Sequence, residues 1–594
     1  MASARLLQLC LALALALLGN QVFFKGPGPV GYRVGAAILG LTLVVGLLLT
    51  VLRPTQLLPP LERLAAHRAA GWATAGALAL TLPLVFSPHW ILLSFTAACL
   101  AVWVAWRRGL YPKTEPQVRA AWLTVLACAL GVRLVFTIAV PWPLWSWDSG
   151  TYLLGAHTWV SGAGQLSFHP ARTPGFGLYA LAILAPFKSY LLYLLVTHGL
   201  GVGVAWWAGR VLRRHYGELA GWLAFAVLAL SPQQIFHEHM LLTEAPFWIL
   251  LTAIAVLLVQ QLRDDAAPKR PVVAAAVLGL ATAAAVLLRP AAVPLPLLIG
   301  AGALLARWSK PRLLALAAAM LLPLLAWIVP NGGLTNMGGI TFFGVAGHHL
   351  DLDSQGHEAI KREMQRGVER HNEDHPWWNP DFNFLVNSRA GPVHTSRSLQ
   401  ALGPFERDRV LKELGVQAIR QHPLRFAGRS AFQLWLWQVS STGFYHPHWE
   451  GLQDHDLIHH ELEPPEARRL LLSRERAAPG LYQYGVVYPS WALGLLPFQV
   501  FEQPLLILLL LGAWRRAPRD RTLLLVLAAL AAALVGLTCA LGVGWLARYH
   551  MQAVPLVAVG FAIVAHGWRA AEHPAATPEN SSPPSPWREV PCRT

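Results

Sequence analysis

Charged side chains are scarce in this sequence of 594 residues, of which 13% are Asp, Glu, Lys or Arg and 55% are hydrophobic. So little charge over such a length excludes a chain built of ordinary water-soluble domains. Apolar runs long enough to cross a bilayer recur along most of the sequence. This pattern is typical of a polytopic membrane protein.

Cysteine is also rare. The five cysteines lie in apolar runs or near the end of the sequence, and none falls between residues 330 and 497, the one large hydrophilic segment. This distribution excludes a disulfide framework. No single basic stripe exists either, because the basic residues behind the net charge of +16 occur in short clusters between apolar runs. The clusters indicate membrane topology, and we expect no nucleic-acid partner.

The apolar runs predict an all-α protein with about fourteen transmembrane helices. The predicted spans lie near residues 4–23, 34–52, 71–87, 89–106, 120–140, 190–211, 218–232, 240–261, 272–288, 291–306, 312–329, 498–513, 522–542 and 549–567. The first run follows Arg5 and is therefore also compatible with a signal peptide. No clean small-residue cleavage site follows it at Gly19, which favours a retained helix.

Basic residues are concentrated in alternate loops. Pairs such as Arg107 with Arg108 and Arg515 with Arg516 fall on one side, whereas the other side has few basic residues outside 330–497. By the positive-inside rule, the side with many basic residues is cytoplasmic. The sequence therefore predicts an integral protein of the cell membrane whose functional site faces the extracytoplasmic side.

This topology predicts five parts in the chain. They are accessory transmembrane helices over 1–119, a catalytic membrane core over 120–329 with a first outer loop at 141–189, an extracytoplasmic domain over 330–497, the last transmembrane helices over 498–569, and a disordered cytoplasmic tail over 570–594. The tail is expected to be disordered because it is rich in Pro and Ser.

The large hydrophilic segment has helical patterns of its own. We expect helices at 356–371 and 404–421. The stretch 424–440 is amphipathic and aromatic, and we expect it to lie on the outer membrane surface, because a further span there would invert the topology of everything after it.

Residues 145–179 carry the strongest functional signal. Asp148 follows an apolar span among Trp and Tyr residues, and Arg172 precedes Pro174 and Gly175, where the chain must turn. Ionisable groups at the mouth of a membrane protein are costly if they are buried without partners, which favours a functional role. The alternative is an ordinary solvated loop.

Five short motifs follow one another on the predicted outer face. They are WDSGTY with Asp148, RTPGFGLY with Arg172, LLTEAPFW with Glu244, LLRP with Arg289, and ARYHMQ with Arg548 and Tyr549. In this order the motifs resemble the GT-C glycosyltransferases of the protein O-mannosyltransferase and lipid A aminoarabinose transferase type. The resemblance covers about residues 120–567.

The resemblance implies an enzyme that takes a sugar from a polyprenyl phosphate and transfers it, with inversion, to an acceptor on the outer face. The acceptor is a lipid, a glycan or a protein. Asp148 matches the catalytic acidic residue of the first outer loop, and Glu244 matches a second acidic residue. Ser149 stands where mannosyltransferases commonly have Glu, so the acceptor class stays open.

The chemistry of this reaction suits the candidate residues. An aspartate such as Asp148 can accept the proton of an attacking hydroxyl. The leaving group is a phosphate anion, so the site needs fixed positive charge, which we assign to three arginines. The resemblance adds Tyr549, because Arg548 and Tyr549 match a late Arg-Tyr pair near the donor phosphate. These donor-phosphate residues are Arg172, Arg289, Arg548 and Tyr549.

Several of these residues also have a simpler explanation. Arg289 and Arg548 lie at helix ends from which an arginine can extend to the lipid headgroups. Glu244 is placed where a helix dipole favours a negative charge. Arg133, inside the span 120–140, is expected to pair with an internal partner or to extend to the surface.

Histidines raise the question of a metal cofactor. Twelve of the 23 histidines fall between 348 and 460, whereas His169 and His237 are closer to the predicted site. His237 lies seven residues before Glu244, which predicts a shared helix face. Both are candidates for a divalent metal, and the alternative is that they are polar residues at a wet interface.

Two other functions are compatible with the composition. A transporter or lipid flippase predicts ionisable residues near the middle of the membrane and two related halves. The candidates here lie at helix ends instead, and no repeat relates the halves. A non-catalytic membrane scaffold is the other alternative, and it predicts that Asp148 and Glu244 are dispensable.

Overall fold

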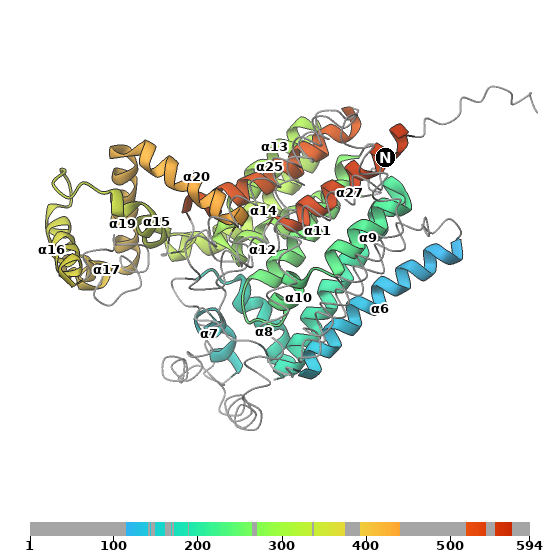
Figure 1. Ribbon diagram of the computed structural model, residues 1–594, viewed down its shortest axis with the longest axis horizontal. Coiled ribbons are helices and arrows are strands. Elements are labelled where there is room, and N and C mark those ends of the chain that lie inside the picture. The colour runs from blue at the N-terminus through green and yellow to red at the C-terminus, as the bar shows by residue number, and fades with distance from the viewer. Residues whose placement is uncertain are drawn as a thin grey trace, which may run out of the picture.

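The computed structural model describes residues 115–139, 143, 149–160, 168, 172–187, 189–263, 270–335, 338–374, 392–439, 518–541 and 553–572. All elements within these ranges are helices (Figure 1). Five of them are long and apolar enough to cross a membrane. The chain is an all-α polytopic membrane protein, as predicted. The predictions for 4–106, 498–513 and the tail lie outside the described residues.

Most described helices coincide with predicted spans. These are α6 (Glu115–Ala139), α9 (Tyr190–Ala229), α11 (Glu244–Leu262), α12 (Pro271–Leu288), α13 (Pro294–Leu305), α14 (Lys310–Asn331), α25 (Pro518–Leu541) and α27 (Val554–Glu572). The helices form where apolar residues run without interruption, since a helix satisfies every backbone hydrogen bond inside the bilayer. The helix starts were harder to predict, and α11 begins four residues after the predicted start at 240.

Helix α9 is a helical hairpin, which explains why the sequence predicted two spans there. Gly217 interrupts it with a φ of +83°, a conformation that glycine adopts without strain. Trp206, before the break, lies 5.2 Å from Phe225, after it, as measured between ring centroids. In a straight helix these residues would be roughly 28 Å apart, so the chain reverses at Gly217.

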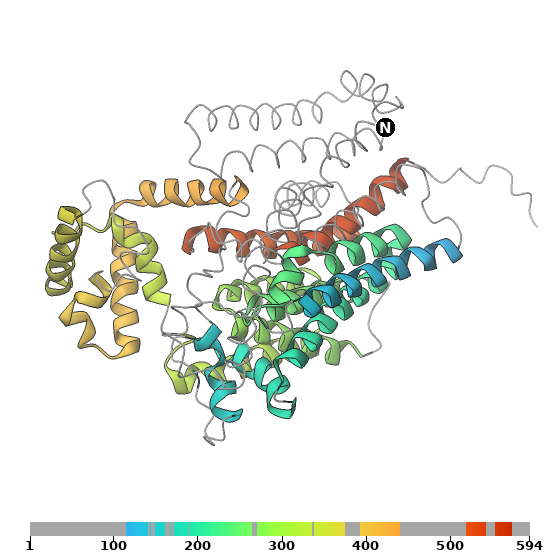
Figure 2. The ribbon, with the colours of Figure 1, turned by 60° about the horizontal axis from the view of Figure 1, so that its bottom comes forward.

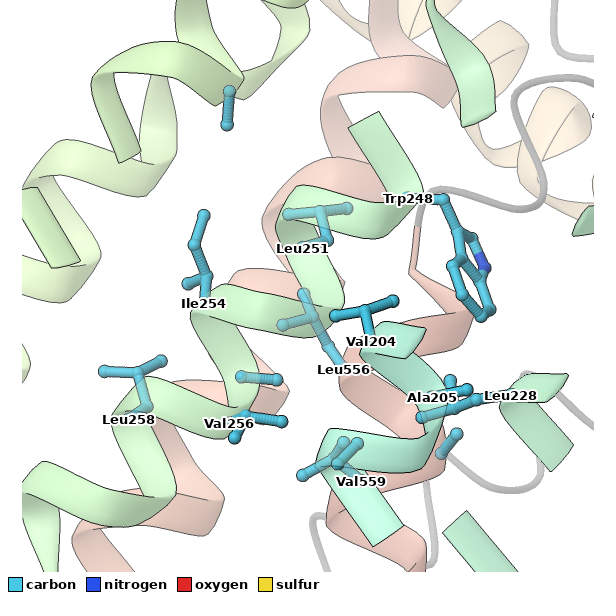
Figure 3. Close-up of a cluster of buried hydrophobic side chains, with 14 of the residues drawn as sticks. Val204, Ala205, Leu228, Trp248, Leu251, Ile254, Val256, Leu258, Leu556 and Val559 are labelled. Carbon is cyan, nitrogen blue, oxygen red and sulfur yellow. The ribbon is translucent and has the colours of Figure 1, made fainter. Parts of the chain in front are cut away.

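The hydrophobic core lies between α9, α11 and α27, which pack against one another. Figure 3 shows side chains from all three helices meeting, among them Val204 of α9, Trp248 and Ile254 of α11, and Leu556 of α27. Trp248 and Leu556 are essentially inaccessible to solvent. This core holds the start of α11 in place.

The predicted first outer loop contains two helices that the sequence analysis did not predict. Helix α7 (Ser149–Val160) is followed by α8 (Gly175–Phe187), and the two pack against each other. Helix α8 also packs against α12. Residues 172–175, at the start of α8, therefore lie next to the membrane helices.

A second helical unit has a core of its own. It consists of α15 (Gly338–Ala346), the 3-10 helix η3 (Gly347–His349), α16 (Glu358–Asp374), α17 (Pro392–Thr395), α18 (Arg397–Gln400) and α19 (Pro404–Gln421). Helices α16 and α19 confirm the predicted helices at 356–371 and 404–421. Phe343, Met364 and Leu411 lie in its buried core. In two views the unit projects from the side of the bundle on which α7 lies (Figures 1 and 2).

Candidate active site

Arg172 lies against the first turn of α7. Its Nε donates to Thr151 Oγ1 at 3.0 Å, and its Nη1 donates to the Tyr152 hydroxyl at 3.3 Å. The guanidinium carbon is 4.4 Å from the centre of the Tyr152 ring, within the range of a cation–π interaction. Helix α7 begins at Ser149, so Arg172 is fixed to the turn that directly follows Asp148. Asp148 itself lies outside the described residues.

The residues after Arg172 contact the end of α12. Thr173 Oγ1 lies 3.5 Å from the carbonyl oxygen of Leu288. A Cβ on Gly175 would lie 2.5 Å from the carbonyl oxygen of Leu287, so only glycine permits this approach. Residues 172–175 are therefore neighbours of Arg289, which follows Leu288 directly.

Arg289 pairs with Glu244. The Arg289 Nη1 is 2.7 Å from Glu244 Oε1 and donates to Thr243 Oγ1 at 3.3 Å. The Thr243 hydroxyl in turn donates to Glu244 Oε2 at 3.2 Å. Glu244 and Arg289 are only 3% and 8% exposed, so Arg289 is held in the protein and does not extend to the headgroups.

Helix dipoles favour both charges of this pair. Glu244 is the first residue of α11, and Arg289 is the C-terminal cap of α12. A carboxylate at a helix N-terminus and a guanidinium at a C-terminus are each stabilised by roughly 0.3–1 kcal/mol. The dipole explanation for Glu244 is therefore compatible with the structure, and it acts together with the ion pair.

Two predicted site residues, Glu244 and Arg289, thus pair directly. Arg172 is held against α7, and the residues after it, Thr173 and Gly175, contact the backbone directly before Arg289. The roles of these residues stay predictions. Three other candidates lie outside the described residues: His169, Arg548 and Tyr549.

The expectation that His237 shares a helix face with Glu244 is wrong. His237 belongs to the short helix α10 (Pro232–Glu238), whereas Glu244 begins α11. The intervening residues 239–243 are not helical, so a spacing of seven no longer corresponds to two helical turns. Within the described ranges, no three His, Cys, Asp or Glu side chains form a group suited to a metal ion.

A buried polar cluster that was not predicted from the sequence lies next to residues 239–243. Glu238 accepts four hydrogen bonds inside the helix bundle. Its Oε2 accepts from Arg133 Nε at 2.7 Å and from His198 Nδ1 at 2.6 Å. Its Oε1 accepts from Arg133 Nη2 and Gln234 Nε2, both at 3.0 Å. The expectation that Arg133 has an internal partner is confirmed.

This cluster consists of Arg133, His198, Gln234, Glu238 and His239, and both oxygens of the Glu238 carboxylate accept hydrogen bonds in it. Arg133 Nη1 also donates to the carbonyl oxygens of Ala129 and Ala229, at 3.1 and 2.7 Å. His198 Nε2 is 2.9 Å from His239 Nδ1. The only signal in the sequence was the polar residues inside apolar runs, which do not reveal their partners. The cluster holds the start of the non-helical segment 239–243 in place. The other end of that segment leads to Glu244, which pairs with Arg289.

A glycine makes room for Glu238. A Cβ on Gly201 would lie 1.9 Å from Glu238 Oε1, whereas a Cβ on Gly199 or Gly203 would meet nothing within 4 Å. We expect Gly201→Ala to lower the unfolding free energy by about 1–3 kcal/mol, because the cluster must move apart. Gly199→Ala and Gly203→Ala are matched controls in the same helix, and neither should destabilise the protein, since alanine is the better helix former. Thermal unfolding in detergent measures the difference, and equal melting temperatures in all three variants would contradict this account.

No protein-family model matches the chain, and no curated protein matches it in sequence. Two crystal structures of ArnT from Cupriavidus metallidurans are similar to it. The apo structure is 14% identical over 77% of this chain and 80% of that chain, with a TM-score of 0.30. The structure bound to undecaprenyl phosphate is 15% identical over 76% and 79%, with a TM-score of 0.31. Likenesses at these TM-scores do not establish a function.

Proposed function

We propose that the protein is a membrane glycosyltransferase that transfers a sugar from a polyprenyl phosphate to a hydroxyl of a lipid, glycan or protein on the outer face of the cell membrane. One observation carries the proposal: Glu244 and Arg289 form a buried ion pair, and Thr173 and Gly175, which closely follow Arg172, contact the end of α12 directly before Arg289. The motif order named Arg172, Glu244 and Arg289 in advance, although they lie 72 and 45 residues apart along the chain. A solvated loop would not require Arg172 to be held against α7 by hydrogen bonds and a cation–π contact.

In the proposed reaction a carboxylate accepts a proton, and arginines stabilise the leaving phosphate. The acceptor oxygen attacks the anomeric carbon, the bond from that carbon to the phosphate oxygen breaks, and polyprenyl phosphate leaves with the electron pair. Asp148 takes the proton of the acceptor hydroxyl. Attack opposite the leaving group inverts the anomeric centre.

Arg172 and Arg289 stabilise the leaving phosphate. A guanidinium presents two parallel donors that match phosphate oxygens, and a water-poor site strengthens these contacts. Glu244 orients Arg289 through the ion pair at 2.7 Å and keeps its charge compensated before the donor binds. Arg548 and Tyr549 are assigned to the same phosphate from the resemblance alone. His169 and His237 stay candidates for a divalent metal because they are close to the site in the sequence.

A direct test is to incubate the purified full-length protein with a panel of polyprenyl-phosphate sugars. We expect at least one donor to release polyprenyl phosphate, by transfer or by slow hydrolysis. If the folded protein released polyprenyl phosphate from none of these donors, the result would count against a glycosyltransferase.

A variant at Arg289 tests the donor-phosphate assignment. Arg289→Ala should weaken polyprenyl-phosphate binding about 10- to 100-fold, the usual value of hydrogen bonds to a charged group, and Arg289→Lys should restore only part of it. Arg270 caps the other end of the same helix and is exposed, so Arg270→Ala is the matched control. Binding of labelled polyprenyl phosphate is measured beside a thermal melt. Equal affinities of the folded Arg289→Ala and Arg270→Ala variants would remove Arg289 from the site.

A transporter or lipid flippase is the second candidate, and the buried cluster around Glu238 favours it. Ionisable side chains inside a helix bundle commonly mark transport pathways. Passage of a fluorescent lipid or polyprenyl phosphate across proteoliposomes, without any release of sugar, would support this candidate over the first.

A further inference from the structure

Basic side chains gather where α19 meets α20 (Pro423–Val439). His422 separates the two helices, and Arg425 and Arg429 are four residues apart on α20, so they share one face. The 3-10 helix η3 packs against α19 and brings His349 to the same place. Burial, and then the positive charges of Arg429, His422 and Arg425, lower the pKa of the His349 imidazole. The four basic groups are therefore close neighbours.

Two polar side chains at this junction, Arg429 and Ser430, each have a buried atom with an open hydrogen-bonding position among the described residues. Arg429 Nη1 and Ser430 Oγ are buried, and neither has a hydrogen-bond partner there. Asp351 is the acidic residue nearest in sequence to His349, but it is exposed, and its Oδ1 accepts from the backbone of Asp353 at 3.2 Å. A buried guanidinium nitrogen without an acceptor is costly, and an anion with several oxygens would offset that cost.

Helix α20 has the composition of a helix that lies on a membrane. Its first turns carry Arg425 and Arg429, and the sequence then continues AFQLWLWQV. Leu424, beside Arg425, is 86% exposed. Helix α20 packs against α25 and crosses it at the end of α25 that lies toward helices α15 to α19 (Figure 1). Basic residues followed by Trp, Phe and Leu are typical of a helix at the headgroup level.

We propose that the first two turns of α20 bind the phosphate of an anionic membrane lipid, with Arg425 and Arg429 as the principal donors and His422 beside them. The basic side chains Arg425 and Arg429 complement the phosphate of such a lipid, and the exposed Leu424 beside them complements its acyl chain. The bound lipid would fix the second helical unit to the membrane. This site is independent of the proposed sugar transfer.

The test uses the full-length protein in a non-ionic detergent, with phosphatidylglycerol as the anionic probe and phosphatidylcholine as the zwitterionic one. Native mass spectrometry measures how much of each lipid is retained. A basic residue near an anionic surface contributes about a five-fold change in affinity, so the double variant Arg425→Gln with Arg429→Gln should retain phosphatidylglycerol about 20-fold more weakly. Phosphatidylcholine binding should change little.

Matched variants distinguish a specific lipid site on α20 from non-specific attraction to positive charge. Arg362 and Arg366 of α16 are also four residues apart and exposed, so their double change to Gln removes the same charge from the same helical unit and should leave binding unaltered. The double change of Arg425 and Arg429 to Lys should keep most of the affinity. If the Gln double variant fails to fold, Arg425→Gln alone, at an exposed position, should still weaken binding about five-fold.

Three results would overturn the proposal. The first is unchanged phosphatidylglycerol retention in the folded Arg425→Gln variant. The second is an equal loss in the α16 control, which would indicate non-specific attraction. The third is displacement of phosphatidylglycerol by millimolar inorganic phosphate, which would indicate a site for free anions.

Discussion

Replacing Asp148 with Asn should reduce the rate of sugar transfer about 100-fold or more, the usual contribution of a positioned general base. The amide keeps the shape of the side chain and cannot accept the proton of the acceptor hydroxyl. Folding should be little affected, because in the sequence the residue lies after the apolar run at 120–140 and before α7, which begins at Ser149. A transfer assay paired with a thermal melt of the purified variant measures both effects.

Asp353→Asn is the matched control, because it makes the same chemical change at an exposed position of the second helical unit. It should leave transfer unaltered. If the folded Asp148→Asn variant keeps activity within a few-fold of the unaltered protein, Asp148 is not the base, and Glu244 becomes the next residue to test. Loss of the melting transition together with activity would assign Asp148 a structural role.

Glu238→Ala should lower the unfolding free energy by about 3–5 kcal/mol, the typical cost of leaving one partner of a buried ion pair alone. The substitution removes the acceptor of four hydrogen bonds and leaves the Arg133 guanidinium without its carboxylate in the bundle. Unfolding in detergent, followed by temperature or denaturant, measures the change.

The double variant Arg133→Leu with Glu238→Leu distinguishes charge burial from packing. It removes both charges, so it should recover much of the stability lost in Glu238→Ala. Glu406→Ala, at an exposed position of α19, controls for the loss of a carboxylate in general. A Glu238→Ala variant as stable as Glu406→Ala would show that the cluster contributes little to the fold.

The candidate site was only partly predictable. The motif order named Arg172, Glu244 and Arg289, and in the structure Glu244 and Arg289 form an ion pair while Arg172 is held against α7. The sequence did not reveal that Glu244 and Arg289 pair with each other, because their contact depends on how the start of α11 meets the end of α12. The spacing of His237 and Glu244 was misleading, because it assumed one helix where the chain forms two.

By itself, the sequence determined the class of the protein and most of its helices. An uninterrupted apolar run must become a helix in a bilayer, and periodic segments such as 404–421 were found within the same bounds in the structure. Only the tertiary structure decided that α7 and α8 form in the predicted first outer loop, that α10 ends before residues 239–243, and that Arg133, His198 and Glu238 share one cluster. The physical reason is that helix formation depends on neighbours in sequence, whereas the partner of a buried charge lies 40 to 105 residues away and is set by which helices pack side by side.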